Sequence, residues 1–265
     1  MQTNELNLFN KKIIQKHNDK ITIFVKKFVN STNQYILEHI SILKPGDTCL
    51  AEYQSEGRGR GGSRWFSPFE NNIYLSMYWK LNKKKMINTG LSIAIGVAIA
   101  ELLNKITNKK IKLKWPNDLY MNNKKLAGIL IELKQNNDNL IHIVIGIGIN
   151  VKMSKDNIKN KNFIIQDWIS LKDETENIEK NEISINIIKT LIKSLILFEK
   201  EGLKPFVEKW FKLDIFLNQK IKLLVNSDIN FGIERGINKH GALLIENSYG
   251  KIISYINGKI FLKEN

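Results

Sequence analysis

One loop at residues 57–64, called the glycine–arginine loop below, restricts the folds that are possible for this chain more than any other stretch. It holds four glycines and three arginines, and a Trp-Phe-Ser-Pro sequence follows it. Its Gly-x-Gly-x-x-Gly spacing matches the dinucleotide-binding fingerprint, but that fingerprint needs a helix that opens at the third glycine. Residues 73–79, which come next after the proline and a polar turn, alternate like a strand. A Rossmann domain is therefore excluded, and the chain also contains no P-loop sequence.

The composition of the same loop predicts that it binds anions. Glycines allow the backbone to approach a ligand closely, and guanidinium groups offer paired donors to phosphate or carboxylate oxygens. A solvated surface loop that keeps its arginines for solubility is the alternative. Trp65 and Phe66 favour a mobile, ligand-gripping loop, because a solvated loop has little use for two large apolar rings.

Charge and cysteine content limit the compartment and the partners. The 265 residues carry a formal net charge of +15, which invites a nucleic-acid-binding function, but the excess is mostly lysine spread among asparagine and isoleucine. Cys49 is the only cysteine, so an intrachain disulfide is impossible and a cytoplasmic location is expected. The N-terminus lacks a secretory signal, and the apolar run at residues 91–103 is short for a membrane span, which predicts a buried helix and no membrane partner.

Polar side chains occur where predicted helices and strands begin or end. Ser31 or Thr32 caps a helix at residues 35–40; the Ser-Thr-Asn triplet is either an ordinary cap or a site for a urea-like or amide ligand. The strand at residues 110–115 ends at a proline, which leaves Asn117 and Asp118 at its exit.

Two predicted hairpins contain further candidate functional residues. Residues 119–121 and 125–133 flank a polar turn, so Lys125 would face Asp118 across the two strands, as a reaction centre or as a surface ion pair. Residues 140–151 are apolar on both faces, which predicts a central strand, and Gly146 and Gly148 leave space on it for a flat ligand.

The remaining parts of the chain predict an edge element near the N-terminus, two helices and a C-terminal group of short strands. Residues 11–27 are a basic amphipathic stretch, interpreted as a solvated edge helix or strand. Residues 183–200 and 203–213 have helical spacing. From residue 221 onward, five short strands separated by Gly, Asn and Asp predict a small barrel.

Four ordered motifs resemble those of the biotin protein ligases of the bacterial type. They are Glu-Tyr-Gln with Gly-Arg-Gly-Arg and Trp-x-Ser-Pro (52–68), Lys-Trp-Pro-Asn-Asp (114–118), Lys-Leu-Ala-Gly-Ile (125–129) and Gly-Ile-Gly-Ile-Asn (146–150). The resemblance implies an α+β fold, with a mixed, mostly antiparallel sheet, helices on one side and a small C-terminal SH3-like barrel. It places an N-terminal extension at 1–28, a biotin- and ATP-binding catalytic domain at 29–213 and the barrel at 214–265.

The resemblance also implies the reaction and its residues. Biotin is activated by ATP as biotinyl-5′-AMP and is then transferred to a lysine of a carrier domain. Lys125, Asp118 and Arg60 would be catalytic. The residues expected to bind biotin are Ser31, Thr32, Asn33, Gln54, Arg58, Gly59, Arg60, Lys125 and Gly128. Those expected to bind ATP or the adenylate are Arg58, Arg60, Trp65, Asn117, Asp118 and Asn150. Mg²⁺ would arrive with the nucleotide, near Asp118.

The expected partner is the biotin carboxyl carrier protein of acetyl-CoA carboxylase, and the expected assembly is a monomer or weak homodimer. Gly61 and Ser63 depart from the family, in which arginines often stand, so the adenylate would be held less tightly. Only about 28 residues precede the matching region, too few for a DNA-binding domain, so no specific DNA binding is expected. The alternatives are a lipoate-protein ligase of the same fold and a basic nucleic-acid-binding protein.

Overall fold

The computed structural model describes residue 9 and residues 21–69, 72–82, 90–135, 140–153, 167–175 and 179–262. The chain divides into two compact units. The first comprises Met1–Lys84 and Met121–Ile192, and the second comprises Lys85–Tyr120 and Lys193–Asn265. Of the predicted extension at 1–28, residues 1–8 and 10–20 lie outside the described part. The domain limits expected from the sequence stay predictions.

The first unit contains five strands of a mixed, mostly antiparallel sheet. Its strands are β1 (Ile23–Lys26), β2 (Thr48–Ala51), β3 (Asn72–Asn82), β7 (Leu140–Asn150) and β6 (Lys124–Gln135), in that spatial order. β1 pairs parallel with β2, and the other neighbours are antiparallel. β7 lies between two long strands with both faces largely buried, which confirms the prediction of a central strand. The basic opening stretch ends as the edge strand β1.

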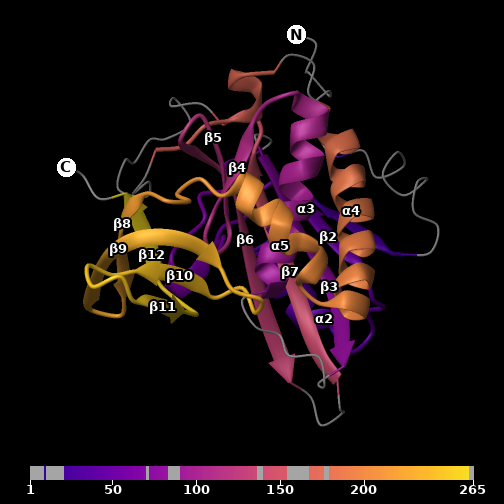
Figure 1. Ribbon diagram of the computed structural model, residues 1–265. Helices are drawn as coiled ribbons and strands as arrows, with labels where there is room; N and C mark the ends of the chain where they lie inside the picture. Colours follow the sequence, from indigo (N-terminus) through magenta and orange to yellow (C-terminus); the bar gives the residue numbers. More distant parts are fainter. Residues whose placement is uncertain are drawn as a thin grey trace. The chain divides into compact units, whose positions relative to one another are not determined.

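Helix α2 (Thr32–His39) covers part of this sheet and contacts β2, β3 and β7 (Figure 1). Its apolar side chains join residues of the sheet in one buried cluster. The cluster consists of Ile36, Ile40, Leu43, Cys49, Tyr78 and Val144. Burial raises the pKa of the Cys49 thiol to about 12, so this cysteine is an inert core residue.

The first unit is also closed by a buried ion pair. Glu52, at the end of β2, lies 2.5 Å from the ammonium of Lys180, the first residue of α4 (Lys180–Glu201), and both side chains are almost fully buried. Because two charges are expensive to bury unless they are paired, this contact fixes the start of α4 against the residue that directly follows β2.

The second unit contains the apolar helix α3 (Gly90–Thr107), strands β4 (Ile111–Lys114) and β5 (Asp118–Met121), and helix α5 (Lys204–Leu213). α3 packs against β4 and α5. By length and composition α3 qualifies as a membrane span, with a mean hydropathy of 1.4, but 67% of it is buried inside the protein. It has the burial of a core helix, as its sequence predicts.

A separate antiparallel sheet of five strands completes the second unit (Figure 1, yellow). Its strands are β8 (Lys220–Val225), β9 (Asp228–Ile237), β10 (Leu243–Glu246), β11 (Ile252–Tyr255) and β12 (Lys259–Leu262). The order is β11-β10-β9-β8-β12, so β11 and β12 form the two edges. The five strands predicted for the tail are all present, and their arrangement agrees with an SH3-like fold.

Candidate active site

The Ser-Thr-Asn triplet forms the mouth of α2. Ser31 is the N-cap, and its hydroxyl accepts from the N–H of Gln34 at 3.5 Å. The side chains of Ser31, Thr32 and Asn33 are all buried. The predicted cap is therefore confirmed, and because buried polar groups must find partners, the triplet also organises what lies around it.

Gln54 connects the triplet to the loop that follows β2. Its Oε1 accepts from the backbone N–H of Thr32 at 2.8 Å, and its Nε2 donates to Ser67 Oγ at 2.9 Å. Backbone hydrogen bonds run from Val29 to Tyr53 O and from Ser55 to Val29 O. Consequently the segment before α2 and the segment that leads into the glycine–arginine loop are held together by hydrogen bonds.

Asn33 and Ser76 extend this network across the sheet. Ser76, from β3, lies 2.7 Å from Thr32 Oγ1 and 2.5 Å from Asn33 Oδ1. Asn33 Nδ2 donates to Glu132 Oε2, on β6, at 2.7 Å. Sequence reasoning missed both Ser76 and Glu132. The sequence shows each of them as a polar residue within a mostly apolar strand, but this pattern does not predict which side chains it contacts.

The glycine–arginine loop folds back on itself as a short irregular hairpin. The N–H of Gly59 donates to Ser63 O at 2.7 Å and that of Trp65 to Gly57 O at 2.8 Å. The tip is a 3-10 turn, Arg60–Gly62, in which Gly61 has φ +58. A side chain is strained at such a φ, so glycine suits this position of the backbone.

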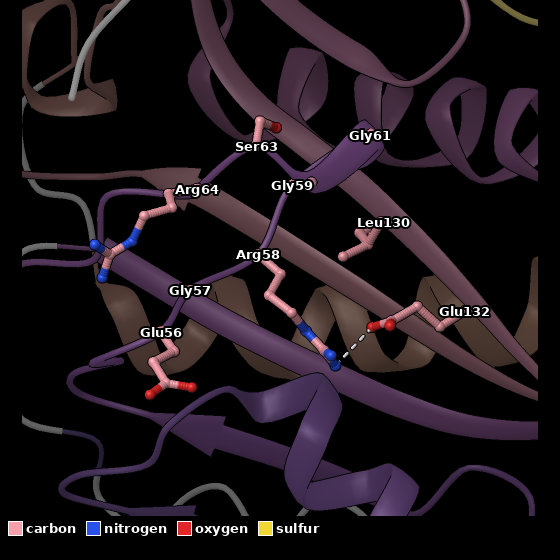
Figure 2. Close-up of a pocket in the computed structure, with 10 residues that line it drawn as sticks. Glu56, Gly57, Arg58, Gly59, Gly61, Ser63, Arg64, Leu130 and Glu132 are labelled. Carbon is pink, nitrogen blue, oxygen red and sulfur yellow. Dashed lines mark hydrogen bonds and ion pairs between the residues drawn. The ribbon is translucent and has the colours of Figure 1, made fainter. Parts of the chain in front are cut away.

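A cavity of about 510 Å³ lies beside this hairpin. It is lined by Glu56, Gly57, Arg58, Gly59, Gly61, Gly62, Ser63, Arg64, Leu130 and Glu132. Figure 2 shows the Arg58 side chain pointing toward Glu132, whereas those of Glu56 and Arg64 point elsewhere. Arg58 NH2 lies 2.9 Å from Glu132 Oε2, and the buried Nε of Arg58 has no partner within the described part of the chain. One donor of this arginine therefore remains for a ligand.

Trp65 and Lys125 lie next to each other at the other end of the network. The Lys125 ammonium is 5.4 Å from the centroid of the Trp65 ring. The indole fills the space above Gly148, where an added Cβ would stand 2.5 Å from Trp65 Cε2, and Asn33 fills the space above Gly146 in the same way. The two glycines do clear room on β7, as predicted, but that room holds Asn33 and Trp65.

Asn150 supports Lys125 from the end of β7. Its Nδ2 lies 3.4 Å from Lys125 O and 3.3 Å from Ile169 O. The backbone of Lys125 also exchanges hydrogen bonds with Asp167 and Ile169. Asn150, predicted to contact the adenylate, thus has a clear structural task as well.

Asn117 and Asp118 belong to the second unit. They follow a cis Trp115–Pro116 bond, and the hydroxyl of Ser92 on α3 donates to Pro116 O at 3.0 Å. Both are partly buried, and Asp118 opens β5. That Asp118 faces Lys125 stays a prediction.

Within the described ranges, no group of three or more His, Cys, Asp or Glu side chains forms a metal site. A dedicated protein cage for a cation is not seen there.

Comparison with known proteins gives a consistent result. Residues 25–150 match the model of the Biotin/lipoate A/B protein ligase family. The bifunctional ligase/repressor BirA of Escherichia coli is 44% identical over 97% of this chain and 79% of its own length. The biotin protein ligase of Aquifex aeolicus, solved with biotin and ATP, superposes with a TM-score of 0.78 at 28% identity, over 92% of this chain and 99% of that one. The biotin–[acetyl-CoA-carboxylase] ligase of Paracoccus denitrificans is 24% identical over 84% of this chain and 93% of its own length.

Proposed function

Because the chain belongs to the Biotin/lipoate A/B protein ligase family, and within it to the biotin protein ligases, we propose how its residues divide the work of that reaction. The protein is an ATP-dependent biotin protein ligase that activates biotin and transfers it to a carrier protein. The observation that carries the assignment of residues is the unbroken set of hydrogen bonds from the Ser-Thr-Asn triplet through Gln54 and Ser67 to the glycine–arginine loop.

The buried triplet binds the polar head of biotin. Ser31, Thr32 and Asn33 offer hydroxyl and amide groups on a rigid helix end, which suits a urea-like ring that both donates and accepts hydrogen bonds. Gln54 fixes the backbone of Thr32, and Gly128 on β6 leaves room on the sheet. Arg58 and Gly59 close the pocket from the loop side.

The cationic side chains serve the first step. A carboxylate oxygen of biotin attacks the α-phosphorus of ATP, the bond to the bridging oxygen breaks, and pyrophosphate leaves. Negative charge is concentrated on oxygens in this step, so Lys125 and Arg60 stabilise it at fixed positions, while Arg58 binds biotin and the adenylate. Trp65 provides a flat surface for the nucleotide, and Asn150 holds the backbone of Lys125 in place. When Mg²⁺ is bound with the nucleotide, with Asp118 as the proposed protein ligand, it supplies further neutralisation of phosphate charge.

In the second step the amine of an acceptor lysine attacks the carbonyl carbon of biotinyl-5′-AMP. The mixed anhydride bond breaks, AMP leaves, and the amine loses a proton. Asn117 and Asp118 orient this amine, and the Asp118 carboxylate accepts its proton. The loop limits the access of water to the anhydride in the meantime.

The carrier, the compartment and the assembly complete the proposal. A biotin carboxyl carrier protein of acetyl-CoA carboxylase is the proposed acceptor, as the name of the Paracoccus denitrificans relative suggests. The protein would act in the cytoplasm as a monomer or weak homodimer. We propose no sequence-specific DNA binding, and the +15 charge should give only salt-sensitive adhesion to duplex DNA.

Incubation with ATP, labelled biotin and a carrier domain tests the assignment. Label should appear on the carrier lysine, with stoichiometric pyrophosphate and AMP. Transfer of lipoate with no transfer of biotin would instead support the lipoate-ligase alternative. Tight binding to one duplex DNA sequence, retained at moderate salt, would contradict the view that the charge has no specific nucleic-acid partner.

A further inference from the structure

Glu132 is a charged residue in a strand that is otherwise mostly apolar. It lies on β6 opposite Val144 of β7, and its side chain is 27% exposed. A single oxygen, Oε2, accepts from both Asn33 Nδ2 at 2.7 Å and Arg58 NH2 at 2.9 Å. The two donors come from different parts of the site: one from the triplet and one from the glycine–arginine loop.

The contact with Asn33 decides which way its amide faces. Because a carboxylate only accepts, Asn33 must turn Nδ2 toward Glu132 and Oδ1 toward Ser76. Ser76 has one hydroxyl proton, and it must donate this proton to Asn33 Oδ1, which is also only an acceptor. Ser76 Oγ also lies 2.7 Å from Thr32 Oγ1, and the hydroxyl of Thr32 lies 3.1 Å from Gln54 Oε1, which only accepts. Glu132 thus fixes the orientation of the Asn33 amide and, through it, the proton that Ser76 donates to Asn33 Oδ1.

The contact with Arg58 places the loop. Both partners are partly exposed, at 36% and 27%, so solvent screens the pair and its value to overall stability is small. The fixed geometry matters more. The guanidinium is held at the edge of the cavity with its buried Nε unpartnered, so an anionic ligand meets a donor that is already in position.

We infer that Glu132 is a positioning residue for the ligation reaction, through the one carboxylate oxygen that orients the Asn33 amide and holds the Arg58 guanidinium. This inference rests on the proposed function, since the groups that it positions are those assigned to biotin and the adenylate. Glu132 itself takes no part in bond making.

Two substitutions separate its two contacts. Glu132→Gln keeps an acceptor for Asn33 but loses the charge that holds Arg58. Glu132→Leu loses both. We expect trypsin to cut ligand-free protein at the loop arginines about fivefold faster in both variants, because the loop is released. The KM for biotin should rise about threefold in Glu132→Gln and about tenfold or more in Glu132→Leu, with kcat for adenylation within about twofold of the parent.

Matched controls make the result specific. Glu38→Gln removes an exposed carboxylate from the same helix as Asn33 and should change neither measurement. In an Arg58→Gln background, Glu132→Gln should alter cleavage at Arg60 and Arg64 by less than about twofold, because the partner is already gone. Saturating biotin and ATP should restore protection in both Glu132 variants.

Unchanged trypsin sensitivity and unchanged biotin KM in both Glu132 variants would overturn the inference, as would a fall in kcat at constant KM. If the parent protein makes no biotinyl-5′-AMP, the proposed function fails instead. The cleavage measurements on ligand-free protein do not depend on that activity, so the two failures can be told apart.

Discussion

The backbone of Lys125 is fixed by hydrogen bonds that do not involve its side chain, so a side-chain substitution tests the ammonium group. The backbone N–H donates to Asp167 O, and the carbonyl accepts from the N–H of Ile169, each at 3.0 Å. Its ammonium projects over the Trp65 ring. A substitution that keeps the backbone should therefore remove the charge from the site without disturbing the strand.

We expect Lys125→Ala to lower the rate of biotin adenylation by about 10²- to 10³-fold, the usual effect of losing one fixed group that stabilises developing charge. Pyrophosphate release with biotin and ATP is the measurement. Lys124→Ala, an exposed neighbour, is the control and should keep full activity. A parent-like rate for Lys125→Ala would remove this residue from the mechanism.

Gly146 tests the triplet from the side of the sheet. A Cβ at this position would stand 2.2 Å from Asn33 Oδ1, so Gly146→Ala must displace the Asn33 amide. Biotin affinity should fall by about tenfold or more, as calorimetric titration would show, because the buried amide loses its partners. Ile141→Val, at a half-buried site on the same strand, should bind biotin normally. Unchanged affinity in Gly146→Ala would mean that Asn33 does not contact biotin.

At the scale of elements, the glycine–arginine loop is a folded hairpin held at both ends. Gln54 and Ser67 tie its two arms together, and the hydroxyl of Tyr74 on β3 donates to Pro68 O at 2.9 Å. Burial raises the pKa of this tyrosine, so the hydroxyl stays a donor at any ordinary pH. Anchored ends with a glycine-rich tip are the arrangement expected of a lid that closes over a reactive intermediate.

The lid assignment predicts the behaviour of Arg60→Gly. Loss of this guanidinium at the tip should loosen the hold on biotinyl-5′-AMP, so the intermediate should escape at least about tenfold faster and modify lysines of unrelated proteins. Release from preloaded enzyme, followed by chase with unlabelled biotin, is the measurement. Arg64, whose guanidinium donates to Ser55 O, gives a comparison through Arg64→Gly, which should retain the intermediate better. Equal release from Arg60→Gly and parent would contradict the role given to the loop.

Much of this arrangement could be predicted because its signals are local. Ser31 predicted the start of α2, and the run of residues that are apolar on both faces predicted that β7 is the central strand. Asn122 and Asn123 both adopt positive φ, as the polar turn before β6 suggested. The parallel pairing of β1 with β2 could not be foreseen, since it depends on contacts between segments about 25 residues apart. The two contacts of Glu132 could not be predicted either, because the sequence shows a carboxylate in a strand but not which donors lie near it.

At the scale of the whole molecule, the second unit contains a buried acid pair where α5 meets the C-terminal sheet. Glu234, on β9, is fully buried beside Asp214, which follows α5. Asp214 accepts from Trp210 Nε1 and from the N–H of Phe216, each at 3.0 Å, so it is the better placed of the two to carry the negative charge. Burial, together with the charge of Asp214 and a hydrogen bond to it, raises the pKa of Glu234 to about 10.

This pair predicts that the protein loses stability as the pH rises. Between the ordinary glutamate pKa of 4.5 and the raised value of about 10, the folded chain holds a proton on Glu234 that the unfolded chain has released. The free energy of unfolding should therefore fall with increasing pH, by up to about 1.4 kcal/mol per pH unit from this group. Denaturant midpoints measured from pH 5.5 to 9 give the slope of this free energy against pH.

Glu234→Gln should flatten this slope, since glutamine does not titrate, and Asp214→Asn should flatten it in part, because the neighbouring charge is gone. Glu208→Gln, an exposed carboxylate on α5, should leave the slope unchanged. A slope identical in parent and Glu234→Gln would show that Glu234 is charged in the folded protein. The two carboxyl groups would then have to be held apart or separately neutralised, for example by Lys112, whose charge lowers the pKa of Asp214.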